Sequence, residues 1–370
     1  MTARDPVADL RRIAFLLERT LESSYRIKAF RTAAAALAQL PPDDVALLAS
    51  TGGLRGIKGI GERTAAVVEQ SVGGEVPGYL ADLEAQAGQP LATGVDHLRA
   101  ALRGDLHTHS DWSDGGSPID EMAATAAGLG HEYTALTDHS PRLTVANGLT
   151  ADRLRRQLAV VAGVNDQGVN EQLGPFRLLT GIEVDILSDG GLDQTPELLG
   201  QLDVVVASVH SELRMPADAM TRRMLAAIEN PHTDVLGHCT GRYVIDRNFD
   251  NDKLSGRTRS GKARPESQFD AERVFAACAE RGVAVEINSR PERLDPPIRL
   301  IELAVSAGCL FSLDTDAHAP GQLDWQPLGC ARALRGGVDP ASIVNTWPLA
   351  DLLAWTADHS HRPGSRFWTS

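Results

Sequence analysis

The stretch Asp105-Leu106-His107-Thr108-His109, followed by Ser113-Asp114-Gly115, places two histidines one residue apart and a carboxylate nearby. Side chains alternate faces along a strand with period two, so the imidazoles of His107 and His109 are expected to point the same way. Two imidazoles on one face, with Asp114 close behind, can hold a cation. This spacing alone is weak evidence for a metal site, so the interpretation depends on the rest of the chain.

Further polar groups follow short apolar runs downstream. The groups are Thr137-Asp138-His139, Gly181-Ile182-Glu183, Ser208-Val209-His210, Gly237-His238 and Asp314-Thr315-Asp316-Ala317-His318. The apolar runs are residues 134–137, 176–180, 202–209, 235–236, 283–287 and 309–313. Apolar runs that alternate with amphipathic segments predict βα units around a parallel sheet or barrel. The carboxyl ends of such strands meet on one face, so these six histidines and three acids are expected to converge.

A single histidine at a strand end is usually a hydrogen-bonded core residue, but the same placement at strand after strand favours a cluster. The remaining histidines lie outside this pattern and are interpreted as surface residues. They are His97, His131, His232, His359 and His361. With no cysteine in the cluster, the expected ligands are imidazoles and carboxylates, which suit Zn²⁺, Mn²⁺ or Fe²⁺ without selecting among them.

The chain has 370 residues, a length that predicts two domains, or one large domain and an appendage. We expect it to be cytoplasmic. No apolar run reaches the roughly 18 residues that a membrane span requires, and the first residues lack the apolar core of a secretory signal. The cysteines show no C-x-x-C spacing, which indicates small buried residues in a reducing compartment.

The net charge of −13 is carried almost entirely by the part of the chain that contains the histidine groups. Residues 1–95 hold ten Lys and Arg against eleven Asp and Glu, whereas the remainder holds 26 against 38. Bound divalent cations would offset part of that acidic excess. Charge balance therefore neither excludes DNA as a partner nor supports it.

Helical patterns cover residues 5–20 and 26–40, and a glycine-rich turn precedes the amphipathic segment 62–71. Such a turn can aim backbone N–H groups at an anion from the start of the next helix, and a phosphodiester backbone is a suitable anion. A helix connection without a ligand is the alternative, but the apolar spacing of Leu54, Ile57 and Ile60 favours DNA binding. The candidate DNA contacts are Gly56, Lys58, Gly59, Gly61 and Arg63.

These motifs support a resemblance that covers almost the whole chain. Residues 7–90 resemble the helix-hairpin-helix domain of bacterial family X DNA polymerases, through residues 25–33 and 56–61. Residues 103–346 resemble the PHP (polymerase and histidinol phosphatase) domain of those proteins, through residues 286–288, 293–295 and 316–318. Because only a linker fits between Gln89 and Asp105, the nucleotidyltransferase core is missing and polymerase activity is not expected. The expected division is a DNA-binding domain at 1–92, a linker at 93–102, a PHP domain at 103–348 and a tail at 349–370.

The resemblance implies a distorted (β/α)₇ barrel that binds three divalent ions and uses metal-activated water to attack phosphorus. It maps nine ligands onto His107, His109, Asp114, His139, Glu183, His210, His238, Asp316 and His318. Glu183 would bridge two ions, because a carboxylate can serve two metals and an imidazole lone pair serves one. Glu183, Asp138 and Arg242 are the candidate catalytic residues.

Several charged residues have two interpretations. Asp138 and Asp105 either orient ligand imidazoles or cap strand ends. Arg242, Arg290 and Arg293 either clamp phosphate or form ordinary salt bridges at the rim. The basic stretch 253–265 is either an arm that reaches DNA phosphates or a solvated insertion.

The favoured function is a metal-dependent phosphodiesterase that acts on DNA 3′ ends or abasic sites during repair, with a polymerase or ligase as a possible partner. A phosphomonoesterase of the histidinol-phosphatase type is the first alternative, although it needs no DNA-binding domain. A DNA-binding scaffold without catalysis is the second, although a degenerate site would have lost ligands.

Overall fold

The computed structural model describes residues 4–166, 175–244 and 263–358, and the chain forms two compact units. One unit extends to Pro90 and the other begins at Leu91. Each unit has a hydrophobic core of its own. None of the helices in the described ranges is long and apolar enough to cross a membrane.

The N-terminal unit is entirely helical in its described residues. Its elements are α1 (Pro6–Arg19), α2 (Ser24–Leu37), α3 (Pro42–Thr51), the 3-10 turn η1 (Gly53–Gly56), α4 (Glu62–Val72) and α5 (Gly78–Ala87). Helix α1 begins where the side chain of Asp5 accepts a hydrogen bond from the backbone N–H of Val7. The core contains Leu10, Leu17 and Phe30, which pack with residues of α4 and η1. The two helices predicted at 5–20 and 26–40 are therefore present, with slightly different ends.

The second unit is built on seven parallel strands. They are β1 (Gly104–Thr108), β2 (Tyr133–Leu136), β3 (Arg177–Asp185), β4 (Val204–Ser208), β5 (Val235–Leu236), β6 (Ala284–Asn288) and β7 (Phe311–Asp314). Their order in the sheet is their order in the sequence. The N–H of His109 donates to the carbonyl of Ala317 at 2.8 Å, and a parallel bridge joins Thr108 to Ala317. The first and last strands thus meet, and the sheet forms the nearly closed seven-stranded barrel that was predicted.

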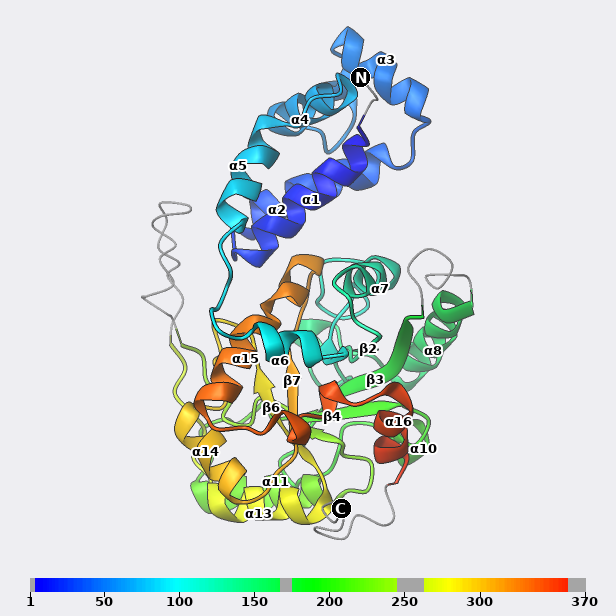
Figure 1. The fold of residues 1–370 in the computed structure, drawn as a ribbon. Helices are drawn as coiled ribbons and strands as arrows, with labels where there is room; N and C mark the ends of the chain where they lie inside the picture. Colours follow the sequence, from blue (N-terminus) through cyan, green and yellow to red (C-terminus); the bar gives the residue numbers. More distant parts are fainter. Residues whose placement is uncertain (1–3, 167–174, 245–262, 359–370) are drawn as a thin grey trace. The chain divides into compact units, whose positions relative to one another are not determined.

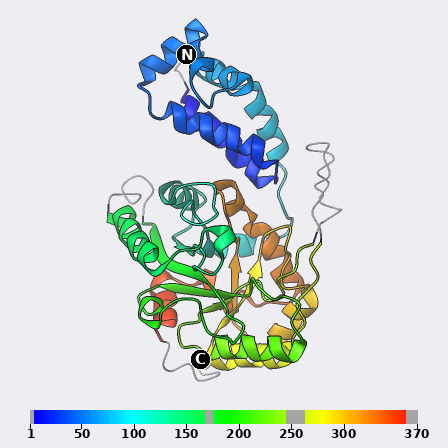
Figure 2. The same ribbon diagram turned by 180° about the vertical axis from the view of Figure 1, so that it is seen from behind.

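Helices surround the strands, as the views from the front and from behind show (Figures 1 and 2). In the described residues these are α7 (Ile119–Gly128), η2 (Thr144–Ala146), α8 (Ala151–Asp166), α10 (Pro196–Leu199), α11 (Ala217–Glu229), α13 (Ala271–Arg281), α14 (Ile298–Ser306), η3 (Pro320–Trp325), α15 (Gln326–Arg335), η4 (Pro340–Ser342) and η5 (Val344–Thr346). The four cysteines are buried and unpaired in this unit, as expected.

The structure differs from the expected linker and tail. Residues 93–102 contain α6 (Asp96–Ala101), and Val95, Leu98 and Leu102 bury one apolar face of this segment in the barrel core. Residues 349–370 contain α16 (Leu349–Ala357), whose Leu352 is fully buried. Both segments have helical apolar spacing, so they pack against the barrel instead of connecting or trailing it.

Strand β3 is longer than the run 176–180 indicated, and Glu183 lies within it. Its first half pairs with β2 and its second half, from Gly181, pairs with β4. A Cβ at Gly181 would lie 2.9 Å from both the Val204 carbonyl oxygen and the Thr137 methyl carbon. Glycine therefore permits the close approach that lets β3 continue as far as the histidine cluster.

Candidate metal centre

The carboxylate of Glu183 is surrounded by five imidazoles from other strands of the barrel. Its Oε1 lies 3.1 Å from His210 Nε2 and 2.8 Å from His238 Nε2. Its Oε2 lies 3.3 Å from His107 Nε2, 3.5 Å from His109 Nε2 and 2.8 Å from His139 Nδ1. These histidines come from or directly follow β1, β2, β4 and β5, so the strand-end convergence predicted from the sequence is confirmed.

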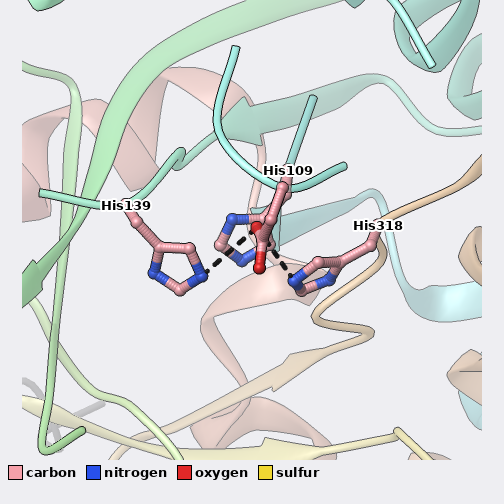
Figure 3. A group of neighbouring side chains, drawn as sticks. His109, His139 and His318 are labelled. Carbon is pink, nitrogen blue, oxygen red and sulfur yellow. Dashed lines mark ion pairs between the residues drawn. The ribbon is translucent and has the colours of Figure 1, made fainter. Parts of the chain in front are cut away.

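A second group lies beside the first and shares two of its histidines. His109, His139 and His318 turn their rings toward one another in Figure 3. Asp114 Oδ1 lies 3.5 Å from His139 Nε2 and 3.4 Å from His318 Nε2. The Asp114 side chain is 36% exposed, whereas Glu183 is buried, so this group is the solvent-facing side of the cluster.

Asp316 completes the set of nine side chains. Its Oδ1 lies 3.5 Å from both His109 Nε2 and His318 Nδ1. Its Oδ2 lies 2.9 Å from Arg293 Nε and 3.2 Å from Asn288 Nδ2. The structure therefore brings all nine predicted ligands into one connected cluster.

Several polar atoms of this cluster are buried and lie close to one another, but their geometry gives none of them a hydrogen bond to a described residue. They are His107 Nε2, both ring nitrogens of His109, His139 Nδ1, Glu183 Oε2, both ring nitrogens of His210, and His238 Nδ1. Orphaned buried polar atoms are rare in folded proteins, and a concentration of them indicates a site for a bound ion. Lone-pair nitrogens and carboxylate oxygens are ligands for divalent transition metals, so the residues fit such ions.

Three overlapping sets of side chains place their ligand atoms within 4.8 Å of one another. The sets are His109-Asp114-His139-His318, His107-His109-Glu183 and His139-Glu183-His210. His109, His139 and Glu183 each belong to two sets, and of these three Glu183 is the side chain whose two carboxylate oxygens can serve two neighbouring ions.

Electrostatics favour the charge states that metal binding needs at two key positions. Burial raises the pKa of Glu183, but the imidazoles of His210, His107 and His139 lower it by more, so the pKa lies well below its ordinary value. Burial lowers the pKa of His109 far below its ordinary value, and the neighbouring His318 and His139 lower it further. The ionised Glu183 and the neutral His109 are therefore competent ligands. Burial lowers the pKa of His107 and His210, but the Glu183 carboxylate raises both by more, to about 9 for His210, so metal binding at those two imidazoles displaces a proton.

Two further carboxylates, which the sequence analysis does not select, support the ligand histidines. Glu286 Oε1 lies 2.6 Å from His107 Nδ1, and the other Glu286 oxygen accepts from the backbone N–H of His238. Asp185 Oδ1 accepts from the backbone N–H of His210 at 3.1 Å and lies 3.5 Å from its Nδ1. Asp185 is two residues after Glu183 on β3, so the same period-two argument that paired His107 with His109 could have identified it.

Asp138 and Asp105 form their hydrogen bonds with groups other than imidazole rings. Asp138 accepts from the Ser110 N–H and hydroxyl, from the Ser113 hydroxyl and from Gln157 Nε2. It therefore fixes the loop that carries Asp114. Asp105 accepts from the N–H and hydroxyl of Thr315 and from the N–H of His107. The capping alternative describes both residues, and the catalytic role expected for Asp138 has no geometric support.

The three candidate phosphate-binding arginines separate into two kinds. Arg242 directs its guanidinium to the carbonyls of Arg293 and Leu294 and to Glu266, so its donors are used to hold a loop. Arg290 Nη1 lies 3.0 Å from the Asp316 carbonyl oxygen and 3.1 Å from His318 Nδ1. Arg293 is 8% exposed, and its Nη1 has no hydrogen-bond partner in the described part of the chain. Arg290 and Arg293 thus border the cluster, whereas Arg242 does not.

The glycine-rich turn of the N-terminal unit connects η1 to α4. Leu54 and Ile60 anchor it in the core, and Gly59 has a φ of +98° that favours glycine. Lys58 and Arg63 are exposed. One expected N–H donor is not available, because the Gly61 N–H donates to the hydroxyl of Thr64 at 2.9 Å.

The structure tests the surface position expected for His131 but not the basic stretch 253–265. His131 was interpreted as a surface residue but is 4% exposed, with Nε2 3.2 Å from Gln326 Oε1. This interpretation was wrong, because His131 lies in the interior two residues before β2, where its ring contacts Gln326 of α15. Most of the basic stretch 253–265 lies outside the described residues, as do His359 and His361.

Comparison with known proteins agrees with this geometry. The family model described as the PHP domain matches residues 105–290, and the model described as a helix-hairpin-helix domain matches residues 1–74. The chain is 34% identical over 274 residues to the "DNA polymerase/3'-5' exonuclease PolX" of Bacillus subtilis (strain 168). That match covers 73% of this chain and 44% of the relative, so the chain spans less than half of the length of that protein.

Shorter relatives match about half to two thirds of this chain. A "Probable phosphatase" of Thermoanaerobacter sp. (strain X514) is 27% identical over 225 residues, covering 58% of this chain and 78% of the relative. A solved structure of histidinol phosphate phosphatase from Lactococcus lactis, complexed with zinc, L-histidinol and phosphate, is 17% identical with a TM-score of 0.41, and covers 64% of this chain and 95% of that one. From the two family matches, the chain belongs to the PHP domain family and carries a helix-hairpin-helix domain before its PHP domain.

Proposed function

We propose that this protein is a metal-dependent phosphodiesterase that hydrolyses DNA. The observation that carries the proposal is the Glu183 carboxylate with five imidazoles around it, several of whose buried ring nitrogens have no hydrogen-bond partner among the described residues. A site of this composition suits Lewis-acid chemistry on a phosphate ester.

Three divalent ions, each Zn²⁺, Mn²⁺ or Fe²⁺, would be held by the nine cluster side chains, with Glu183 shared between two of them. When bound, such ions polarise the phosphoryl group and acidify water, which makes a nucleophile available near neutral pH. Glu286 holds the His107 imidazole through Nδ1, which leaves Nε2 toward Glu183, and Asp185 holds the backbone N–H of His210 and lies beside its ring.

The protein's own cations would bind the substrate phosphate. Arg293 is buried beside Asp316 and has an unpaired Nη1 within the described residues. Arg290 lies against His318 at the same edge. A guanidinium presents a planar fork of donors, so these two side chains can hold the non-bridging oxygens of a phosphodiester while water attacks phosphorus.

The N-terminal unit directs the proposal toward DNA. The turn from Gly56 to Gly61 exposes Lys58 shortly before α4, and Arg63 lies in the first turn of that helix. Backbone N–H groups at a helix N-terminus and nearby cations bind phosphates without reading sequence. Since the Bacillus subtilis relative is named a 3'-5' exonuclease, digestion or trimming of 3′ ends is the favoured reaction, with abasic-site cleavage as a further form.

A trimmed 3′ end is a substrate for a polymerase or a ligase, so enzymes of these two classes are the partners that we propose. A phosphomonoesterase acting on a small metabolite is the second candidate, because the chain also matches relatives named probable phosphatases. A DNA-binding scaffold without catalysis is disfavoured by the presence of all nine ligands in one cluster.

One experiment separates these possibilities. The purified protein is stripped of metal, reloaded separately with Mn²⁺, Zn²⁺ and Fe²⁺, and incubated with 3′-labelled, gapped and abasic duplexes, and in parallel with histidinol phosphate. Metal-dependent release of nucleotides that the Glu183→Gln protein does not produce would support the proposal. Hydrolysis of histidinol phosphate alone would favour the second candidate, and no hydrolysis of any substrate would favour the scaffold.

A further inference from the structure

Two arginines that face the same tyrosine extend the positive edge of the metal centre. The guanidinium carbon of Arg293 lies 5.0 Å from the ring centroid of Tyr243, and that of Arg264 lies 4.9 Å from the same centroid. Tyr243 and Arg264 are also paired through two backbone hydrogen bonds of 2.9 Å. The two cations are therefore at most about 10 Å apart, within roughly one Debye length at physiological salt.

The pair is connected to the cluster by direct contacts. Arg293 Nε lies 2.9 Å from Asp316 Oδ2, and Asp316 Oδ1 lies 3.5 Å from His109 Nε2. Arg264 makes the other cation contact with the Tyr243 ring. Contacts therefore lead outward from the metal centre, from Asp316 to Arg293, from Arg293 to the Tyr243 ring, and from that ring to Arg264.

Little negative charge neutralises the outer cation. Arg264 Nε donates to the carbonyl of Gly241, and no carboxylate forms an ion pair with Arg264 in the residues that the structure describes. Burial lowers the pKa of Arg264 and the charge of Arg293 lowers it further, and the more distant Asp295 carboxylate offsets only part of this. A second anion beside the ring would relieve both costs.

The neighbouring arginines are engaged in a different way. Arg242 is bonded to two carbonyls and to Glu266. Arg299 has a 62% exposed side chain and pairs with the other oxygen of Glu266. Both contact a carboxylate, so Arg264 is the member of this group that can accept a ligand.

We propose that Arg264, with Tyr243 and Arg293, forms a subsite for a second phosphate group next to the one that is hydrolysed. The subsite would make an oligonucleotide, with one phosphate per nucleotide, a better substrate than an ester with a single phosphate. This inference rests on the proposed phosphodiesterase function and names the substrate class of that same site.

The test compares a thymidine dinucleotide, which has one phosphodiester, with the trinucleotide, which has two. For the metal-loaded wild-type protein we expect kcat/KM to be about tenfold higher for the trinucleotide, the size of one charge-assisted contact. Arg264→Gln should bring that ratio close to one while leaving dinucleotide hydrolysis within about twofold. Arg264→Lys should keep part of the preference, and Arg299→Gln, a matched loss of charge nearby, should keep all of it.

Equilibrium binding to the metal-depleted protein gives a readout that does not need turnover. The trinucleotide should bind more tightly than the dinucleotide, and Arg264→Gln should reduce the slope of log K against log salt by about 0.7, the value for one phosphate of a single strand. Equal affinities for both oligonucleotides, or the same loss for both in Arg264→Gln, would overturn the subsite. If the wild-type protein hydrolyses neither oligonucleotide but the Arg264-dependent binding increment is present, the proposed function fails, and Arg264 is shown to bind a second phosphate without a role in hydrolysis.

Discussion

His107 Nδ1 and Glu286 Oε1 are 2.6 Å apart, and both side chains are completely buried. The other oxygen of Glu286 accepts the backbone N–H of His238, so one carboxylate of β6 holds a ligand on β1 and another that follows β5. This contact favours Nδ1 of His107 as the protonated nitrogen and leaves Nε2 directed at Glu183, 3.3 Å away.

Replacing Glu286 with Gln should weaken the metal centre without removing a ligand. The amide keeps the shape of the side chain but loses the charge that supports the imidazole, so metal affinity or activity should fall by about 10- to 100-fold. Metal content after dialysis against a graded chelator measures the effect. Glu302→Gln, an exposed glutamate on α14, is the control, and unchanged metal retention in Glu286→Gln would refute the supporting role.

Replacing Glu183 with Gln should abolish hydrolysis, since the side chain that five imidazoles surround loses its charge. A decrease in kcat of at least about a thousandfold is expected if the carboxylate bridges two ions. The fold should be retained and DNA affinity should persist, because the hairpin belongs to a separate unit. Circular dichroism and DNA binding check those two expectations, and turnover close to that of the wild type would contradict the assignment of the site.

The position of the metal centre was predictable because it depends on one regular property of the chain. Histidines and acids directly after short apolar runs converge once those runs form parallel strands, whatever the loops do. Val235–Leu236 and His238 illustrate this, since a strand of only two residues still delivers its ligand to the cluster.

Contacts across the barrel were not predictable in the same way. Glu286 lies inside a buried strand, where its partner is set by the position of β1 in the sheet, 179 residues away in the sequence. The three arginines were equivalent in the sequence, and only the folded loops show that Arg242 uses its donors on carbonyls while Nη1 of Arg293 has no partner among the described residues. Helices α6 and α16 were missed because short apolar patterns beside a domain boundary resemble linkers.

Changing Gly61 to Ala should reduce affinity for nicked or gapped duplex by about tenfold, or about 1.4 kcal/mol. The φ of Gly61 is −97°, and an added Cβ would meet no protein atom within 4 Å, so the substitution causes no clash within the protein and its methyl group stands where a phosphate would approach. Fluorescence anisotropy with labelled duplex measures the change, with hydrolysis of a small phosphodiester as the control that should be unaffected. Full DNA affinity in this variant would show that the turn does not contact the backbone.

Gly59→Ala provides a contrasting case in the same turn. Its φ is +98°, and an added Cβ would lie 2.6 Å from Thr32 Cγ2. Gly59→Ala should therefore lower the free energy of unfolding by about 1 kcal/mol or more, in addition to any loss of DNA binding. Chemical denaturation of the two variants should therefore separate strain in the turn from contact with DNA, and equal stability of both would contradict this distinction.

Buried His131 should make the protein less stable in mild acid. Burial, together with the charge of Arg99, lowers the pKa of His131 to about 3 in the folded protein. In the unfolded chain this histidine has its ordinary pKa of 6.5, so between pH 6.5 and pH 3 the unfolded chain binds a proton there that the folded protein does not. The contribution of His131 to the free energy of unfolding is therefore fully present above about pH 6.5 and decreases as the pH falls toward 3. At pH 5 the decrease is about 2 kcal/mol.

Unfolding of wild type and His131→Gln at pH 7 and pH 5 measures this effect, and the variant should lose correspondingly less stability. His97 is exposed, so His97→Gln should behave like the wild type. An identical pH dependence in all three proteins would exclude the contribution of His131.

The protein should process DNA without extending it. Template-directed synthesis needs a carboxylate set beside a nucleotide pocket, and Glu183, Asp114 and Asp316 face imidazoles in the barrel. The helical unit ends at Pro90 and β1 begins at Gly104, and α6 occupies part of that interval, so no further domain fits between the two units. Incubation with primed template, Mn²⁺ and four deoxynucleotides should shorten the labelled primer or leave it unchanged. A ladder of longer, template-dependent products from protein free of contaminating polymerase would show that the chain contains a synthetic site elsewhere.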